Sequence, residues 1–296
     1  MDNRLGVPAA ILSSALGGSA AAVTRYLIGA TDPVTLTALR FGTGFICLLP
    51  LALLGGGAWP DRRDWPAVAA LGLLFFGVFS TVFNEALRQT TAARGAMALS
   101  TLPLLTMLVA AALGAERLTA RKSLGVLIAI GGVALALLGG LGGAPDGAWR
   151  GDLIMVGGAL LMALYSIWSR PYLARISPLN FATVAMGSGA AAAAAYAVID
   201  GGFSASSAFS WRQWLGVLYM GAAASAASFF LWMWALRHAS PTRVTATITV
   251  HPVSAALVAV VLVAEPIGWN LVLGVIAVSV GLWIASTMPQ RRVGGV

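Results

Sequence analysis

The chain has 296 residues, of which 59% are hydrophobic and 9% are charged, and its formal net charge is +8. A soluble globular domain carries about 25% charged residues, so a water-soluble fold could not hide this much apolar surface. The composition therefore predicts a multi-pass protein in a lipid bilayer. The basic residues lie singly or in pairs between apolar runs, which argues against nucleic acid as a partner. The single cysteine, Cys47, excludes an intramolecular disulfide and a cysteine-based metal site.

Ten apolar runs follow one another along the chain, and each could cross a bilayer as a helix of about 20 residues. Charged residues, prolines or glycine clusters separate them. The runs are about twice as long as a membrane β-strand, which needs only ~10 alternating residues. The predicted fold class is therefore an all-α polytopic membrane protein. Its ten helices are expected at residues 6–28, 33–54, 66–87, 93–114, 121–141, 151–172, 178–199, 212–236, 241–263 and 267–287.

The basic residues predict how the helices are oriented. Counted over alternate loops, the side that holds the amino terminus has 12 lysines and arginines, and the opposite side has five. The positive-inside rule then places both termini in the cytoplasm. The count assumes that residues 6–28 span the membrane. A cleaved signal peptide is the alternative for this run, although its apolar length suits a spanning helix better.

A proline followed by a glutamate recurs at the same spacing in two parts of the chain. Pro103 precedes Glu116 by 13 positions, and Pro252 precedes Glu265 by 13, so a separation of 149 residues relates the two pairs. Further tryptophan, glycine and arginine residues recur at the same separation. Residues of the first two predicted helices recur after 145 positions. We therefore expect two five-helix halves, residues 1–145 and 146–296. Because five is odd, the second half would be inverted in the membrane.

Two long segments carry a resemblance to a known family. "ALRQTTAARGAMALSTLPLLTMLVAAALGAERLTA" and "ALRHASPTRVTATITVHPVSAALVAVVLVAEPIGW" resemble the paired EamA repeats of the drug/metabolite transporter superfamily. The resemblance covers nearly the whole chain and is greatest for bacterial aromatic amino acid exporters. It implies a substrate cavity formed by helices one, three, four, six, eight and nine, with helices five and ten at the periphery. The second copy departs from the pattern, because Pro266 stands where the first copy has Arg117.

Aromatic and hydroxyl side chains recur at helical spacing in the predicted third, sixth and eighth helices. An aromatic cavity with few ionisable groups suits a planar apolar side chain. Aromatic residues also gather at membrane interfaces, so any single one of these residues could instead lie at the interface or face lipid. The candidate faces consist of Phe76, Phe79 and Phe83, then Met162, Tyr165, Trp168 and Ser169, and finally Ser225, Ser228, Phe229 and Trp232.

Pro103 and Pro252 predict hinges in the fourth and ninth helices, because proline removes an intrahelical hydrogen bond and clashes with the preceding turn. Nearby polar groups could bind substrate or could merely satisfy the freed carbonyls. They are Ser100, Thr101, Thr247, Thr249 and His251. The histidine is also a candidate for proton coupling, because its unperturbed pKa of about 6.5 is near physiological pH. A neutral hydrogen-bonding histidine is the alternative.

Three ionisable residues lie within or near the second and third predicted helices. Arg40 is about seven residues inside a helix, or roughly 10 Å from its start. Glu85 and Arg88 are spaced as an i, i+3 pair, and Glu85 could also reach Arg40. We favour a structural or outer-gate ion pair for these residues over substrate binding. Glu116 and Glu265 are expected to terminate helices.

These features together predict a secondary transporter that exports aromatic or other apolar amino acids by alternating access. The sequence contains no metal-ligand spacing, phosphate-binding loop or nucleophile motif. We therefore predict no enzymatic activity and no cofactor, and a small molecule as the substrate. One alternative is a broad-specificity drug or metabolite exporter, with or without proton coupling. A membrane scaffold built by duplication is the other, and the sequence does not indicate the oligomeric state.

Overall fold

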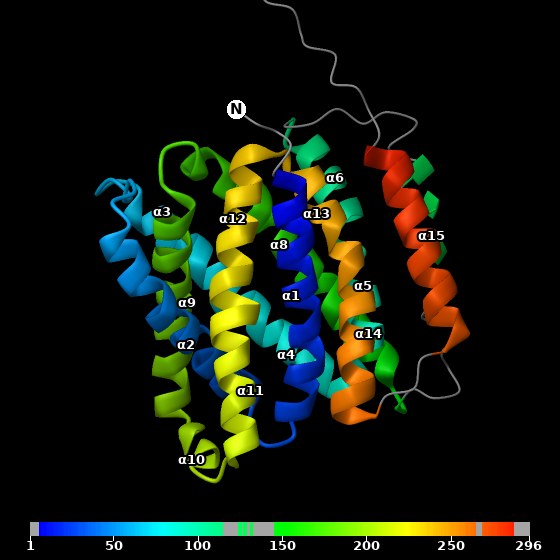
Figure 1. Cartoon of the computed structure of the whole chain (residues 1–296), viewed down its shortest axis with the longest axis horizontal. Helices are drawn as coiled ribbons and strands as arrows, with labels where there is room; N and C mark the ends of the chain where they lie inside the picture. The colour runs from blue at the N-terminus through cyan, green and yellow to red at the C-terminus, as the bar shows by residue number, and fades with distance from the viewer. Residues whose placement is uncertain are drawn as a thin grey trace, which may run out of the picture.

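The computed structural model describes residues 6–114, 124–125, 127–128, 131–132, 145–264 and 268–286. Across these ranges the chain forms helices joined by short loops and contains no strand. Eight helical segments within them are long and apolar enough to cross a membrane, and they pack as one bundle (Figure 1). The all-α membrane fold is confirmed. Most of the predicted helix 121–141 lies outside the described residues, as do Glu116 and Glu265.

The first four spans have the following elements. They are α1 (Gly6–Leu27), α2 (Pro33–Leu54), a third span made of α3 (Trp65–Gly72), the π-helix η1 (Leu73–Phe79) and α4 (Ser80–Gln89), and a fourth span made of α5 (Ala92–Leu99) and α6 (Leu102–Ala112). The predicted bounds of these spans agree with the structure to within three residues. In Figure 1 the third span descends from α3 to α4, whereas the fourth ascends from α5 to α6.

The later part of the chain forms four more spans and a final helix. The spans are α8 (Ala148–Leu173), α9 (Pro178–Ile199), then α11 (Trp211–Gly221), η2 (Ala222–Ala227) and α12 (Ser228–His238), and lastly α13 (Pro241–Ala246), η3 (Thr247–Thr249) and α14 (Val250–Val263); short α10 (Phe203–Ser206) precedes α11, and α15 (Trp269–Ser286) ends the described chain. The segment from α11 to α12 ascends in Figure 1, opposite to the third span, and that from α13 to α14 descends.

Polar residues followed by proline start several spans. Asp32 accepts hydrogen bonds from the backbone N–H groups of Val34 and Thr35, 2.9 and 2.8 Å away, at the start of α2. Ser177 caps α9 in the same way. A side-chain acceptor at this position satisfies amide groups that have no partner inside the helix, and proline fits the first helical position. The sequence thus determines sharp helix starts here.

Glycines bring spans from distant parts of the chain into close contact. A Cβ atom on Gly44 of α2 would lie 3.1 Å from the carbonyl oxygen of Gly221 in α11, and one on Gly189 of α9 would lie 2.7 Å from that of Gly72 in α3. Small residues at such crossings let helix backbones approach one another in a membrane. The crossings hold α2 against the α11–η2 segment and α9 against the third span.

A buried ion pair joins the fourth span to α8. Arg94 Nη2 lies 2.5 Å from Asp152 Oδ2, and the side chains are 11% and 9% exposed. Thr90, which follows α4, donates a hydrogen bond to the other carboxylate oxygen at 2.8 Å. Charged groups are tolerated in the interior when they are paired and hydrogen-bonded. This cluster fastens the turn between the third and fourth spans to the start of α8.

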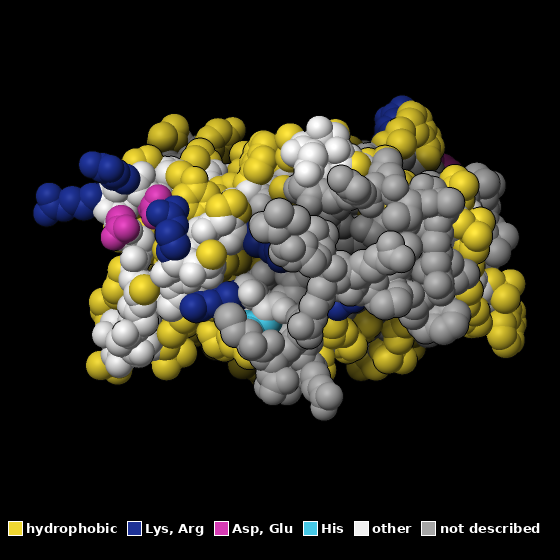
Figure 2. All heavy atoms as spheres, turned by 90° about the horizontal axis from the view of Figure 1, so that it is seen from above, with side chains coloured by type: hydrophobic (Ala, Val, Ile, Leu, Met, Phe, Trp, Pro, Cys, Tyr) yellow, Lys and Arg dark blue, Asp and Glu magenta, His cyan; other side chains and the backbone are white. Residues whose placement is uncertain are grey.

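The surface of the bundle separates apolar flanks from polar ends. Large hydrophobic side chains are strongly exposed on the helices, including Leu54 and Ile199, both 86% exposed, and Val261, 82% exposed. Figure 2 shows hydrophobic side chains along the flanks and charged side chains gathered at one part of the end that it views. The exposed loop with Asp61 and Arg62 lies before α3. Such flanks match a lipid environment.

Candidate substrate cavity

A small cavity lies between the spans, and residues of α1, α2, η1, α4, α5, α8, α12 and α14 line it. The space open to the centre of a water molecule is about 40 Å³, enough for roughly three waters at 10–15 Å³ each. The helices are therefore closed around the site in this conformation. The lining consists of Ser13, Gly17, Arg40, Phe41, Phe75, Phe79, Ser80, Phe83, Leu99, Met162, Ser228, Phe229, Trp232 and His251.

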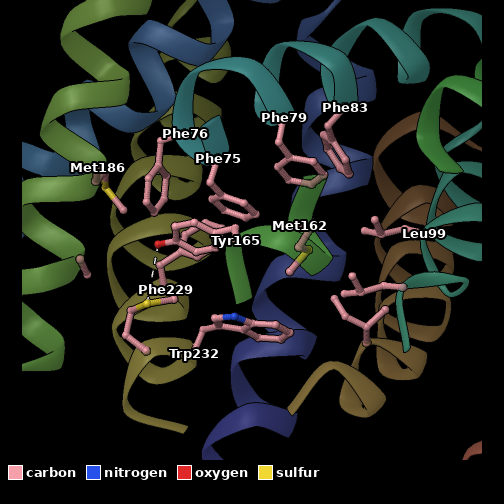
Figure 3. Packing of buried hydrophobic residues seen from close by; sticks show 14 of the residues in the cluster. Phe75, Phe76, Phe79, Phe83, Leu99, Met162, Tyr165, Met186, Phe229 and Trp232 are labelled. Atoms are coloured by element: carbon pink, nitrogen blue, oxygen red, sulfur yellow. Dashed lines mark hydrogen bonds between the residues drawn. The ribbon is translucent and has the colours of Figure 1, made fainter. Parts of the chain in front are cut away.

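Aromatic rings from three spans form one side of the site (Figure 3). The Phe75 ring stacks on Phe79 with centroids 4.6 Å apart and on Tyr165 with centroids 4.4 Å apart. It meets Phe229 edge to face, with a centroid distance of 5.1 Å and an interplanar angle of 76°. A further ring could join this cluster by stacking or by an edge contact, both of which are favourable for aromatic pairs.

The π-helix η1 decides which phenylalanines of the third span line the cavity. The predicted face contains Phe76, Phe79 and Phe83, but the structure places Phe75 at the cavity in place of Phe76. A π-turn contains one more residue than an α-turn, so the residue four positions before Phe79 shares its direction. Phe76 is fully buried instead, against Phe41 and Phe229.

The predicted face of α8 is only partly correct. Met162 lines the cavity, and Tyr165 is fully buried in the aromatic cluster, where its hydroxyl group donates to Met233 Sδ at 3.7 Å. Trp168 is 44% exposed and lies in a separate pocket with Tyr172 and Pro241. Two successive steps of three residues rotate a side chain by about 120° around an α-helix. That rotation carries Trp168 away from the face of Met162.

A cluster of small polar groups joins α1 to α12 and α14. Ser13 Oγ donates to the Ser228 carbonyl at 2.7 Å, and Ser228 Oγ donates to the Ser13 carbonyl at 2.9 Å. A Cβ atom on Gly17 would lie 2.9 Å from His251 Nε2, so the absence of a side chain leaves room for the imidazole. These contacts place α1 inside the bundle.

Arg40 lies at the cavity and not in the expected ion pair with Glu85. Its Nε donates to Ser225 Oγ at 2.8 Å, its Nη2 donates to the Ala224 carbonyl at 3.3 Å, and its guanidinium lies 4.8 Å from the Phe41 ring centroid. The residue is 6% exposed, which also excludes snorkelling to the surface. Its acceptors belong to η2, so the packing of α2 on this π-helix directs the side chain inward.

Glu85 instead pairs locally at the end of α4. Arg88 Nη1 lies 3.1 Å from Glu85 Oε2, and Gln89 donates to the other carboxylate oxygen at 2.7 Å. The predicted i, i+3 pair is confirmed as an ion pair, although both side chains are largely exposed. An exposed pair of this kind contributes about 0–1 kcal/mol to stability. Whether it acts as a gate stays a prediction.

The fourth and ninth predicted helices are both interrupted at the expected prolines. Ser100 and Thr101 form a turn between α5 and α6, with Pro103 in the first turn of α6. A 3-10 segment separates α13 from α14, with Pro252 in the first turn of α14. The first turn of a helix tolerates proline because its N–H groups have no intrahelical acceptor. Motion about these interruptions stays a prediction.

The hydroxyl groups beside the first interruption face the backbone and not the cavity. Ser100 Oγ donates to the Ala96 carbonyl at 3.1 Å, and Thr101 Oγ1 donates to the Ala98 carbonyl at 2.8 Å. They restore local hydrogen bonds, which was the alternative role expected for them. His251 does line the cavity. The side chain of Thr249 lies outside the described part of the chain.

Several lining residues were not predicted from the sequence, among them Arg40, Phe75 and Gly17. A glycine in an apolar helix gives no chemical signal. The position of Arg40 depends on which helix α2 contacts. The recurrence of Phe83 as Trp232 after 149 residues was the most useful signal, because both residues line the cavity.

Membrane-length helices closed around an aromatic and basic cavity define a membrane transport protein. The chain belongs to the EamA-like transporter family, which it matches over residues 4–138 and again over residues 149–287. The family is one of transporters and not of enzymes.

Several bacterial proteins are similar to the chain. An uncharacterised protein of Pseudomonas aeruginosa is 36% identical over 142 residues, which cover 48% of the chain and only 47%, about half, of that relative. The "Probable terminal-alkyne amino-acid exporter" of Streptantibioticus cattleyicolor is 27% identical over 70% of the chain and 68% of its own length. The uncharacterised inner membrane transporter YedA of Escherichia coli is 27% identical over 90% and 86%, respectively.

A solved crystal structure has the same fold. It aligns with a TM-score of 0.74 and 23% sequence identity, and the alignment covers 98% of the chain and 99% of the solved protein. At this identity the likeness concerns the fold alone.

Proposed function

We propose that the protein is an inner-membrane secondary transporter that exports aromatic or other apolar amino acids. One observation carries the proposal: the cavity combines an aromatic side with Arg40 and His251, and the described part of its lining contains no carboxylate. The aromatic rings suit the side chain of such a substrate through stacking and dispersion. The basic side suits its carboxylate.

The lining favours an amino acid over a lipophilic cation, which a broad drug exporter would carry. A cation in a dry cavity needs an opposite charge or several acceptors to replace its water. Here it would meet the guanidinium of Arg40. The amino-acid exporter among the relatives supports the same substrate class. We further propose that the chain is most similar to the aromatic amino acid exporter YddG.

We further propose ten helices in two inverted repeats, residues 1–145 and 146–296. Three neighbouring residues of the third span line the cavity, namely Phe79, Ser80 and Phe83. The residues 149 positions later are Ser228, Phe229 and Trp232 of α12, and they line it too. The two segments run in opposite directions in Figure 1, and the family matches the chain twice. Inverted repeats are the architecture of alternating-access carriers, with substrate bound between the halves.

Alternating access explains how a substrate could enter and leave the closed cavity. A site with room for only a few waters must open to admit an amino acid. The interruptions at Pro103 and Pro252 lie in spans that contribute Leu99 and His251 to the lining. Bending there would open one side of the cavity at a time. Proton coupling through His251 stays a prediction within this proposal.

The aromatic side of the cavity by itself also fits apolar drugs, so a broad drug or metabolite exporter is the second candidate. A scaffold without transport is disfavoured, because the family is one of transporters.

Reconstituted protein tests the proposal directly. Proteoliposomes loaded with unlabelled phenylalanine should take up labelled phenylalanine by saturable exchange, and tryptophan should compete. A lipophilic cation such as tetraphenylphosphonium should not compete. Protein-free liposomes serve as the control. Saturable exchange of the cation without exchange of phenylalanine would favour the broad drug exporter, and the absence of any exchange would favour the scaffold.

A further inference from the structure

We infer that Arg40 and Trp232 bind the carboxylate group of the substrate, and that this group contributes more to recognition than the substrate's amino group does. The inference rests on the proposed function and specifies which end of the substrate each part of the cavity binds. It follows from the donors that remain unused at the cavity.

The guanidinium of Arg40 keeps unused donors at the cavity. An arginine has five N–H groups in a planar fork. In Arg40, Nε donates to the Ser225 hydroxyl and Nη2 donates to the Ala224 carbonyl. Nη1 donates no hydrogen bond to any described residue. The side chain also forms no ion pair with a carboxylate in the described part of the chain. A membrane-embedded charge without a counter-ion is costly, and a bound carboxylate would supply that counter-ion with charge-assisted hydrogen bonds.

Trp232 supplies a second donor without a partner. The residue is 2% exposed, it lines the same cavity, and its indole Nε1 is buried without an acceptor in the described structure. Leaving a buried donor without an acceptor costs free energy, so buried polar groups nearly always have partners. Figure 3 shows the ring on the side of the aromatic cluster opposite to Phe79 and Phe83. A ligand acceptor at this donor would remove the cost.

The acceptors at the cavity for the amino end of a substrate are uncharged groups, since each serine hydroxyl keeps only oxygen lone pairs for this role. The hydroxyls of Ser13 and Ser228 donate to each other's backbone carbonyls, and the hydroxyl of Ser80 donates to the Phe75 carbonyl at 3.0 Å. Among the residues that the structure describes, no carboxylate lines the cavity. The described lining thus offers a charged donor in Arg40 and no charged acceptor, so an anionic group gains more from the site than a cationic one does.

Three probes separate the two ends of the substrate. Phenylalanine carries both groups, 3-phenylpropionate carries the carboxylate alone, and phenethylamine carries the ammonium alone. Binding to the purified full-length protein is measured by calorimetry. We expect 3-phenylpropionate to bind nearly as well as phenylalanine, and phenethylamine to bind at least about tenfold more weakly, the minimum loss from removing one charge-assisted hydrogen bond.

Variants then assign the effect to the two residues. Arg40→Gln should raise the Kd of both carboxylate probes by about 10- to 100-fold, and Arg40→Lys by less, because lysine keeps the charge without the planar fork. Trp232→Phe keeps an aromatic ring and removes the donor, so it should weaken the carboxylate probes alone. Matched controls are Arg212→Gln and Trp211→Phe, which alter exposed residues at the start of α11, and both should bind like the parent.

The outcomes distinguish this inference from the proposed function. If the parent exchanges phenylalanine but binds phenethylamine as well as 3-phenylpropionate, the carboxylate site is wrong and the transport function stands. If 3-phenylpropionate binds in an Arg40-dependent manner but phenylalanine is not exchanged, the site stands and the proposed function is wrong. Equal loss of all probes in Trp232→Phe would also reject the site. Should Arg40→Gln fail to fold, Arg40→Lys and the parent's probe series decide.

Discussion

The side chains at the cavity divide by chemistry between parts of the bundle. Ser13, Gly17 and His251 adjoin one another where α1 meets α12 and α14, whereas Phe75 and Phe79 stack within the third span. This division suits an amphipathic ligand, with its ring among the aromatic residues and its charged end near Arg40. Removing one of these rings should therefore weaken the binding of aromatic ligands more than that of aliphatic ones.

Phe79→Leu tests the division at a single residue. Leucine keeps the site apolar but removes the stacking surface, which is worth about 0.5–1.5 kcal/mol for an aromatic pair. We expect the Kd of phenylalanine to rise several-fold and that of leucine to change little, as measured by calorimetry. The control is Tyr196→Leu, because Tyr196 is 56% exposed on the flank of α9. Equal weakening of both amino acids would contradict the aromatic assignment.

The candidate residues were predictable where helical spacing is regular. Phe83, Phe229 and Trp232 line the cavity as expected and lie on regular α-helix, and Phe79, which ends η1, lines it four residues before Phe83. The spacing rule failed for Trp168, because two successive steps of three residues turn its side chain away from the face of Met162. The role of Arg40 was not predictable, since its partners in η2 are about 185 residues away in the sequence and only packing brings them together.

Among the elements, α8 and the start of the fourth span are joined by the buried ion pair of Asp152 and Arg94. Asp152 is 6% exposed, and both its carboxylate oxygens have partners, Thr90 and Arg94. Removing one partner of a buried ion pair leaves the other charge uncompensated, which costs about 3–5 kcal/mol. This contact should therefore contribute more to stability than the ion pairs at the surface.

Asp152→Asn tests this contribution. We expect the variant to lose a few kcal/mol of unfolding free energy in detergent, about 3–5 by the general rule for buried pairs, measured by denaturant unfolding. The control is Glu85→Gln, which removes the partner of Arg88 from an ion pair whose side chains are 36% and 52% exposed, and this change should cost at most about 1 kcal/mol. A similar loss in both variants would mean that the buried pair has no special role.

Helix bounds were predictable to within three residues because charges, capping residues and prolines mark them in the sequence. The π-helices η1 and η2 were not predicted. A π-turn depends on a carbonyl finding a donor five residues away, and the local sequence of small and aromatic residues gives no sign of this choice. One consequence was the exchange of Phe75 for Phe76 at the cavity.

On the scale of the whole molecule, the arrangement of spans predicts which ends face each side of the membrane. The loop before α3 and the segment around α10 lie at opposite ends of the bundle in Figure 1. From the excess of basic residues we predict that the first of these faces the cytoplasm. The second should face the periplasm.

Cysteine labelling measures this orientation. In a Cys47→Ala background, a membrane-impermeant maleimide should label Ser207→Cys in intact cells and label Asp61→Cys only after permeabilisation. Both positions are exposed and neither carries a basic residue, so the substitutions do not remove positive charge. The opposite pattern would place the termini outside.

The all-helical membrane fold was predictable because hydrophobic length is a property of the sequence alone. The closed state of the cavity was not, because it depends on how α1, α2 and α14 meet across the bundle. The close approaches of Gly17 to His251 and of Gly44 to Gly221 are apparent only in three dimensions.

The central claim is that an aromatic amino acid binds in the cavity with its ring among the phenylalanines and its carboxylate at Arg40. Crystals grown with 4-bromophenylalanine test it most directly, because bromine gives an anomalous signal. We predict a bromine peak within contact distance of Phe75, Phe79 or Phe229 and carboxylate density at Arg40 and Trp232. A bromine peak beside Arg40, or one outside the cavity, would contradict the claim.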